Sequence, residues 1–295
     1  MQIDITTTAM PRPDILDRCY SSFQKYLIGV DFTECDCYIN IDPLPASNER
    51  QCKYINQMIS ATIETAKKHF GNVIVRAPKT PNYAAAYKWL WSKAQSDIIL
   101  NIEDDWELLR PISVNHLIKK FTAIKTLYQI VFRAYSYVYP TCCTSPSLLH
   151  RRWYKPVSNG MNKIENPESQ IHKNNNNKFS VFVPNRKTCD SKKHPGKKRE
   201  IEKYIIPYPK NNFDRSCIIV KDIGKKWIEN SPYISPVDLI RREKEMYRKH
   251  KHKMDRDQKI YAKKCIESLK KSNFLSWVIR PDVNPLKWLM EYKCK

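Results

Sequence analysis

The sequence predicts an α/β fold with a mainly parallel central sheet, helices on both faces, and a basic, helix-rich C-terminal extension. Apolar segments alternate with amphipathic helical segments over residues 1–135, which is typical of βαβ units with right-handed crossovers. Residues 97–102 are mostly Ile and Leu, as in a strand that is covered on both faces. Glu103, Asp104 and Asp105 follow directly, at the end of the strand where open α/β sheets bind ligands.

The strands and helices before these acids are expected to alternate along the chain. The strands are predicted at residues 3–7, 37–42, 72–76 and 97–102, and the helices at residues 14–27, 48–70 and 83–91. Two prolines indicate a loop after the first strand, and Asp14 is expected to cap the helix that follows it. The second strand ends on an acid, Asp42, as the fourth one does.

The pattern is weaker beyond the acids. A helix over residues 113–127 leads to a fifth apolar segment over residues 128–133. Residues 134–200 are expected to form mainly solvated loops, because they are rich in Tyr, Pro, Asn and Lys. Later strands are predicted at residues 179–183, 204–208 and 217–220, and later helices at residues 222–228 and 237–271.

The charge is distributed unevenly. Residues 1–110 hold 12 Lys and Arg against 14 Asp and Glu, whereas residues 111–295 hold 40 against 16. Lysine-rich helices are often merely solvated, but this excess is above the net charge of roughly 2 to 8 that solubility requires of a small domain. We therefore expect a core over residues 1–135, a part of the same domain with mobile basic loops over residues 136–236, and a basic helical extension over residues 237–295 that favours a polyanionic partner.

Two functional classes are disfavoured by what the sequence lacks. No apolar run reaches the roughly 18 residues of a membrane span, so we expect no transmembrane segment. The ten cysteines show no CxxC or other zinc-binding spacing, and the chain begins with a strand rather than a secretory leader. We therefore expect reduced thiols and a cytoplasmic protein, with Cys35 and Cys37 buried beside a strand.

Three consecutive acids need a compensating partner, because adjacent carboxylates repel and raise one another's pKa. A divalent cation is well suited, since magnesium commonly binds one or two carboxylates together with the phosphates of a substrate. The alternative is an acidic cap at a junction between a strand and a helix.

Several motifs together resemble GT-A-fold glycosyltransferases, whose core is Rossmann-like. The motifs are Thr6-Thr7-Thr8, Arg12-Pro13, Asp42, Asn82-Tyr83-Ala84-Ala85-Ala86 and Glu103-Asp104-Asp105-Trp106. The resemblance is closest to the family 2-like branch, including phage and viral members. It covers residues 1–135, and reaches the tail only through Asn166-Pro167-Glu168 and through Asp222, Gly224 and Trp227.

The resemblance implies a nucleotide-diphosphate sugar as donor and Mn²⁺ or Mg²⁺ as cofactor, with residues 1–135 as the nucleotide-sugar-binding core and residues 136–236 on the acceptor side. Asp105 stands where the family's DXD-type motif places its direct metal ligand, and Glu103 takes the first acidic place. Asp104 would face the ribose or the sugar. Further residues of the nucleotide-sugar site would be Thr7, Thr8, Arg12, Asp42, Asn82 and Tyr83.

An inverting transfer also needs a carboxylate to take the proton of the acceptor hydroxyl. Glu168 is the candidate base, with Asp222 behind it. Both positions have a simpler interpretation, because acids are common at the starts of helices.

The acceptor is left open between three hypotheses. The first is a glycosyltransferase acting on a modified base in viral DNA. Aromatic residues near Arg151 and Arg152 could stack a flipped base; they are Tyr135, Tyr137, Tyr139, Trp153 and Tyr154. The second keeps the enzyme but gives it a surface polysaccharide or lipid-linked sugar, with residues 274–279 and 288–290 making peripheral contact with an anionic membrane. The third is a non-catalytic nucleic-acid-binding protein, in which the acids only cap a helix.

Overall fold

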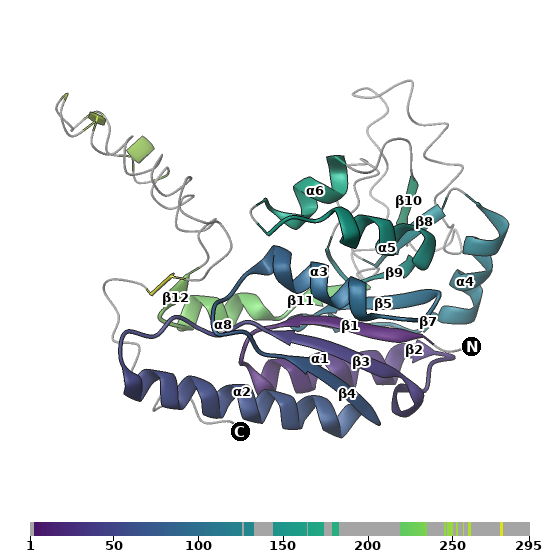
Figure 1. Ribbon diagram of the computed structural model, residues 1–295, viewed down its shortest axis with the longest axis horizontal. Coiled ribbons are helices and arrows are strands. Elements are labelled where there is room, and N and C mark those ends of the chain that lie inside the picture. The colour runs from purple at the N-terminus through teal and green to yellow at the C-terminus, as the bar shows by residue number, and fades with distance from the viewer. Residues whose placement is uncertain are drawn as a thin grey trace.

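A computed structural model describes the core of the chain. The described residues are 3–125, 127–132, 144–163, 165–173, 179–182 and 219–234, with residues 245, 247–249, 252, 256, 259–260 and 278–279 of the extension. Their centre is a seven-stranded mixed sheet with the order β10-β8-β9-β5-β1-β3-β4 (Figure 1). All of its strand pairs are parallel except the two made by β9, so the predicted mainly parallel α/β fold is confirmed.

The strands of the large sheet are β1 (Asp4–Ala9), β3 (Asp36–Ile41), β4 (Asn72–Arg76), β5 (Ile98–Glu103), β8 (Leu127–Val131), β9 (Ser147–His150) and β10 (Phe179–Phe182). Three two-stranded pairs lie outside it. They are β2 (Leu27–Ile28) with β7 (Ile112–Ser113), β6 (Trp106–Leu108) with β11 (Val220–Asp222), and β12 (Tyr233–Ile234) with β13 (Val278–Ile279).

The helices are α1 (Pro13–Tyr26), α2 (Glu49–His69), α3 (Tyr83–Lys93), α4 (Val114–Ala123), α5 (Arg151–Gly160), α6 (Pro167–Lys173) and α8 (Gly224–Asn230), with a 3-10 turn η1 (Phe32–Glu34). Four of them begin at a capping side chain, since Asn48, Asn82, Ser113 and His150 accept a backbone N–H of α2, α3, α4 and α5 respectively. The predicted cap at Asp14 is wrong. Helix α1 begins at Pro13, whose fixed φ and missing N–H suit the first helical position.

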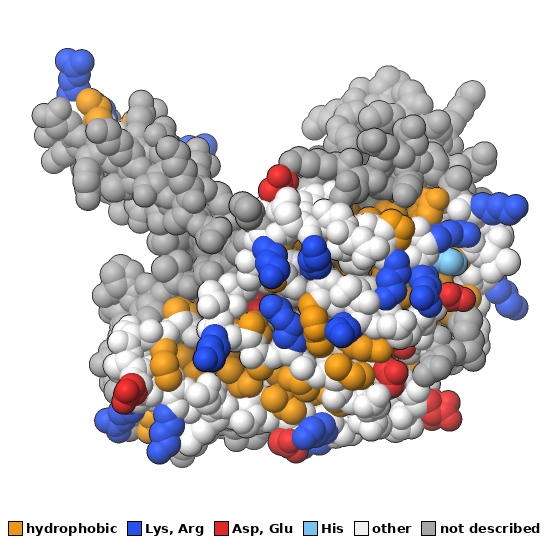
Figure 2. Space-filling view, viewed as in Figure 1, with side chains coloured by type: hydrophobic (Ala, Val, Ile, Leu, Met, Phe, Trp, Pro, Cys, Tyr) orange, Lys and Arg blue, Asp and Glu red, His pale blue; other side chains and the backbone are white. Residues whose placement is uncertain are grey.

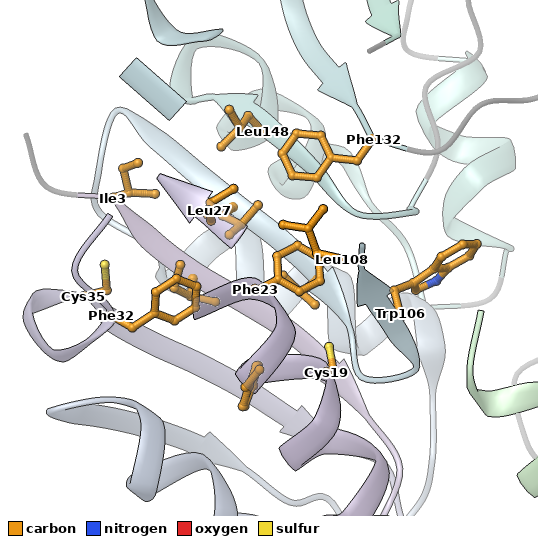
Figure 3. Packing of buried hydrophobic residues seen from close by; sticks show 14 of the residues in the cluster. Ile3, Cys19, Phe23, Leu27, Phe32, Cys35, Trp106, Leu108, Phe132 and Leu148 are labelled. Carbon is orange, nitrogen blue, oxygen red and sulfur yellow. The ribbon is translucent and has the colours of Figure 1, made fainter. Parts of the chain in front are cut away.

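Two apolar layers enclose the sheet. On one face α1, α2 and α4 pack through side chains such as Phe23, Ala66 and Phe121, and Figure 3 shows Phe23 close to Leu108 in this layer. On the other face α3, α5 and α6 pack through Trp91, Trp153 and other aromatic residues. Because β1 and β5 lie in the middle of the sheet between these layers, the chain segments that follow them are held firmly in place.

The acids do not cap a helix. Asp104 and Asp105 form a turn that connects β5 to β6, and β6 pairs with β11 from the far end of the chain. The alternative interpretation of an acidic helix cap is therefore wrong, because the residues after the turn continue as a strand.

Residues 134–200 were predicted to form mainly loops, but their described parts contain strands and helices. Strand β9 inserts antiparallel between β5 and β8, and α5 follows it directly. A four-residue strand gives little periodicity, and Pro156 inside α5 interrupts the helical pattern of the sequence. The predicted strand at 204–208 lies outside the described residues, as do most of the predicted helix at 237–271 and the aromatic residues 135, 137 and 139.

The described cysteines Cys19, Cys35, Cys37 and Cys52 are free thiols, and the first three are buried. The expected burial of Cys35 and Cys37 is confirmed. No helix among the described residues is long and apolar enough to cross a membrane.

Candidate active site

The candidate site lies at the carboxyl ends of the central strands. Thr8 of β1 pairs with Glu103 of β5, and the N–H of Asp104 donates to the carbonyl of Thr8 at 3.1 Å. On the other side of β1, the N–H of Asp42 donates to the carbonyl of Ala9 at 2.9 Å. The register of three parallel strands thus brings Thr8, Asp42 and the acidic turn to one edge of the sheet.

Arg12 and Asp104 form a buried ion pair beneath this edge. Nε of Arg12 donates to Oδ2 of Asp104 at 3.0 Å, and Nη2 donates to Oδ1 at 2.5 Å. The N–H of Met10 also donates to Oδ2 at 3.0 Å, so both carboxylate oxygens have donors. The residues are only 2% and 3% exposed. Burial would lower the pKa of Arg12, but the charges of Asp104 and Asp105 outweigh it and raise this pKa, so the guanidinium stays cationic.

Asp105 is the more accessible member of the pair of aspartates, with a side chain that is 23% exposed. Its Oδ2 accepts Nη2 of Arg12 at 3.1 Å, while no hydrogen bond to its Oδ1 occurs among the described residues. Asp105 therefore offers one carboxylate oxygen to a ligand, whereas Asp104 is committed to Arg12.

The segment β11–α8 closes over Asp105 and Arg12. The N–H of Ile223 donates to the carbonyl of Asp105 at 2.8 Å, and the Arg12 guanidinium lies 5.2 Å from the ring centroid of Trp227. A Cβ on Gly224 would come within 2.3 Å of Oδ2 of Asp105 and 2.9 Å of Nη1 of Arg12, so only glycine permits this approach. Nη1 is buried without a hydrogen-bond partner among the described residues.

Glu103 is linked to Glu168 through two hydroxyl groups. Tyr83 lies 2.8 Å from Oε1 of Glu103 and 3.0 Å from Oγ1 of Thr144, which in turn is 3.0 Å from Oε1 of Glu168. Nε1 of Trp106 donates to the other oxygen of Glu103 at 2.9 Å. Burial, with the charge of Asp105 adding to it, raises the pKa of Glu103 to about 7.

The direction of this chain follows from counting its protons. Three hydrogen bonds need three protons, and the two hydroxyls supply two of them. The third proton therefore belongs to one of the two carboxyl groups. The raised pKa favours Glu103 as its holder, which leaves Tyr83 to donate to Thr144 and Thr144 to donate to Oε1 of Glu168.

Thr144 fixes the position of Glu168. Its carbonyl accepts Nδ2 of Asn101 at 2.7 Å and the hydroxyl of Tyr87 at 3.3 Å. Glu168 lies in the first turn of α6, as a helix-start acid would, but its carboxylate also accepts the N–H of Thr144 at 3.4 Å. No hydrogen bond to Oε2 of Glu168 occurs among the described residues, so that oxygen is available to a substrate hydroxyl.

Asp222, the second candidate base, lies exposed at the end of β11. Its Oδ1 accepts the N–H groups of Gly224 and Lys225 at 3.0 and 3.2 Å, as expected of an acid before a helix. Partial burial, followed by the charge of Asp105, raises the pKa of Asp222.

The predicted nucleotide-binding residues differ in their exposure. Thr7 is fully buried, and its Oγ1 accepts the hydroxyl of Tyr20 at 2.9 Å. Thr8 is almost buried beside Tyr87. Asp42 accepts Nδ2 of Asn40 at 2.9 Å, and its burial raises its pKa to about 6.

Asn82 connects the first turn of α3 to the segment after α5. Its Oδ1 accepts the N–H of Ala85 at 2.8 Å, and its Nδ2 donates to the carbonyl of Lys163 at 3.0 Å. The predicted residues Tyr83 and Glu168 therefore meet around Thr144, with Asn82 next to Tyr83 at the start of α3. Arg12, Asp104, Asp105 and Asp222 form a second group beside α8.

Of the three consecutive acids, Asp105 is the one with a carboxylate oxygen available to a divalent ion. The described residues contain no group of three or more His, Cys, Asp and Glu side chains arranged to hold a metal. Both oxygens of Glu103 are engaged in hydrogen bonds, with Tyr83 and Trp106, so the carboxylate left for an ion is that of Asp105, with Asp222 nearby. This donor set fits an ion whose coordination shell is completed by substrate phosphates, because Mg²⁺ in proteins commonly uses only one or two carboxylates.

Thr144 is the residue of the site that the sequence did not suggest. It lies outside every quoted motif, and only the fold brings it between Tyr83 and Glu168. Trp227 was noted for its position after Gly224, but nothing in the sequence indicated that it would cover Arg12.

No protein-family model matches the chain, and no curated protein matches it in sequence. Solved structures that resemble it in fold include two glycosyltransferases by name. The mannosyltransferase PcManGT from Pyrobaculum calidifontis, in complex with GDP-Man and Mn²⁺, is 9% identical over 62% of this chain and 55% of its own, with a TM-score of 0.44. Mouse xyloside xylosyltransferase 1 is 6% identical over 75% of this chain and 97% of its own, with a TM-score of 0.39.

S. aureus TarS, residues 1–349, is 10% identical over 57% of this chain and 53% of its own, with a TM-score of 0.38. The chain spans about half the length of the solved TarS 1–349 chain and of the mannosyltransferase chain. Identities this low concern the fold alone, so the function rests on the residues of the site.

Proposed function

We propose that this protein is a glycosyltransferase that moves a sugar from a nucleotide-diphosphate sugar to an acceptor hydroxyl. The observation that carries the proposal is the arrangement of carboxylates at the ends of β1 and β5. A partly exposed Asp105 lies beside a fixed cation, Arg12, and the same edge of the sheet holds Glu168 with one oxygen free among the described residues. Such a site can neutralise a leaving diphosphate and accept a proton, which are the two requirements of the transfer.

Asp105 is the residue that would bind Mn²⁺ or Mg²⁺, with Asp222 as its neighbour. When bound, the ion supplies positive charge against the diphosphate that leaves. Arg12 adds a permanent cation beneath the acidic turn. Its Nη1 has no hydrogen-bond acceptor among the described residues. The metal role of Glu103 stays a prediction, because its carboxyl group is engaged by Tyr83 and Trp106.

Glu168 is the proposed general base. Thr144 holds Oε1 of its carboxylate and leaves Oε2 to take the proton of the acceptor hydroxyl. Asp42 and Thr8, at the neighbouring strand ends, are the proposed contacts to the nucleoside, with Asn82 and Tyr83 on the side of the sugar. The buried Thr7 would support them from below.

The acceptor that the charge favours is nucleic acid, and we propose a modified base in DNA. The excess of 40 Lys and Arg over 16 Asp and Glu in residues 111–295 supports a polyanionic acceptor, because such a surface gains affinity when it releases counterions from phosphates. A surface polysaccharide or lipid-linked sugar is the alternative acceptor, and a non-catalytic nucleic-acid-binding protein is the alternative from another class.

Hydrolysis of a panel of nucleotide sugars, with and without Mn²⁺ or Mg²⁺, tests the proposal. We expect metal-dependent release of the nucleoside diphosphate from one donor, and its loss in Asp105→Asn. Tight DNA binding without hydrolysis of any donor, and with Asp105→Asn unchanged in every property, would instead support the non-catalytic alternative.

A further inference from the structure

The two faces of the large sheet carry different charge patterns. Helices α3 and α5, which pack on one face, contain five basic residues and no acidic one; the five are Lys88, Lys93, Arg151, Arg152 and Lys155. Helices α1, α2 and α4, on the other face, contain eight basic and four acidic residues, so positive charge there is partly balanced. Figure 2 shows Lys and Arg side chains gathered over the region where α3 and the start of α5 lie in Figure 1.

These cations have no carboxylate partners among the described residues. The ion pairs found among the described residues involve Arg12, Arg18, Lys67 and His69, and none of them includes a residue of α3 or α5. Lys155 donates instead to the carbonyl of Ser92, and Arg151 donates to the carbonyl of Gln95. Such bonds fix the side chains without neutralising them, so the helix pair keeps its positive charge.

The pKa values of Lys155 and His150 are consistent with the positive charge of α3 and α5. Burial lowers the pKa of Lys155, and the charge of Arg151 lowers it further. Burial also lowers the pKa of His150, and the charge of Arg152 adds to the effect. Burial is the larger cause in both groups, and the neighbouring arginine adds to it more than the nearby acids Asp4 and Asp97 oppose it.

The basic helix pair leads into the candidate site. Helix α3 runs from Lys93 to Tyr83, which contacts Glu103, and Asn82 at its start is bonded to Lys163 after α5. Its 11 residues span about 16 Å at 1.5 Å per residue, which is the length of about five steps along a nucleic-acid strand at 3.4 Å each.

We propose that the exposed surface of α3 and α5, with Lys163, binds the phosphodiester backbone of a nucleic acid and guides it to the site at the start of α3. Its identity as the path of the acceptor rests on the proposed glycosyltransferase function, but the binding itself does not. An anionic membrane fits less well. Of the residues that the structure describes, the large hydrophobic side chains that are exposed are Ile28 and Ile260, and neither belongs to this surface. Its largest apolar side chain, Trp89, is half-buried against the core, so the described surface presents no large exposed apolar side chain to lipid.

The test compares two charge-neutralised proteins of equal net charge. Lys93→Gln with Lys163→Gln removes two exposed cations from the basic surface, and neither ammonium group forms a hydrogen bond or ion pair among the described residues. Lys53→Gln with Lys68→Gln is the matched control on α2, where Lys68 occupies the last turn just as Lys93 does in α3. Binding to a short DNA duplex and to phosphatidylserine vesicles is measured as a function of salt.

The slope of log affinity against log salt is negative, and we expect its magnitude to be smaller by about two in the surface variant. Each lost phosphate contact reduces this magnitude by about one. Between about 50 and 200 mM salt, the variant should then lose about tenfold less affinity than the wild type, whereas the control should follow the wild type. Equal slopes for the two variants would overturn the proposal, as would wild-type binding to vesicles but not to DNA.

Donor hydrolysis measured on the same proteins separates this inference from the proposed function. If hydrolysis is intact and both variants bind DNA equally, the nucleic-acid-binding surface is refuted while the glycosyltransferase proposal stands. If the surface variant binds DNA less well but even the wild type hydrolyses no donor, the surface is supported while the glycosyltransferase proposal is refuted.

Discussion

Asp104 contributes to folding more than to substrate binding, and this can be measured. Its carboxylate accepts three hydrogen bonds, one from Met10 and two from Arg12, and it is 3% exposed. In Asp104→Ala the guanidinium of Arg12 stays buried without its main counter-ion. Removing one member of a buried ion pair costs about 3–5 kcal/mol. A loss of this size lowers the melting temperature by about 6–20 °C in a domain of this size class.

Denaturant unfolding of Asp104→Ala and Asp105→Ala provides the assay. Asp105 accepts one bond from Arg12, at 3.1 Å, and its side chain is 23% exposed, so its removal should cost about 1 kcal/mol. An unfolding free energy for Asp104→Ala within about 1 kcal/mol of the wild type would refute the argument. Replacing both partners, as in Arg12→Met with Asp104→Leu, should recover much of the loss, because an apolar pair leaves no buried charge unpaired.

Three further predictions concern the residues around this pair. Gly224→Ala should destabilise the protein by about 1–3 kcal/mol in denaturant unfolding, because its Cβ would come within 2.6 Å of the Cβ of Asp105, which no rotamer change relieves; an unchanged stability would contradict the close approach of α8. Because burial raises the pKa of Glu103 from its usual 4.5 to about 7, its contribution to stability is complete below about pH 4.5 and is lost as the pH rises through 7. Unfolding followed from pH 5 to 8 should therefore show a decline that Glu103→Gln flattens, and an equal decline in both proteins would count against the protonated carboxyl. Thr144→Val should lower kcat for donor hydrolysis about tenfold or more with little change in KM, while Thr144→Ser restores it, since only the hydroxyl orients Glu168; equal losses in both variants would indicate a packing role.

Much of the fold was predictable because its first half is built from repeated local patterns. The strand at residues 72–76 was predicted with its observed bounds, and β5 was recognised by its apolar run before the acids. Helix α3 begins after Asn82, whose side chain caps it. In each case the information lies within a few neighbouring residues, where periodicity and capping chemistry act.

The rest depends on contacts between distant segments, which local patterns do not contain. Strand β9 takes its place between β5 and β8 through hydrogen bonds to both, and its four residues are too few to show a period. The site was predicted as a set of strand ends, but its division into two groups was not. Arg12 selects Asp104 over Asp105 because the loop after β1 turns its guanidinium under the acidic turn. Thr144 enters only through the folding of the chain onto β5.

The central claim is that Asp105 binds a nucleotide-diphosphate sugar through a divalent ion. The most direct measurement is the melting temperature of wild type and Asp105→Asn with a panel of nucleotide sugars, each with and without Mn²⁺. Asparagine keeps the shape of the side chain and can still accept the bond from Arg12, so the substitution removes charge rather than structure. We predict that one donor stabilises the wild type only when Mn²⁺ is present, and that the same donor leaves Asp105→Asn unchanged. Equal stabilisation of both proteins, or of neither by any donor, would contradict the account.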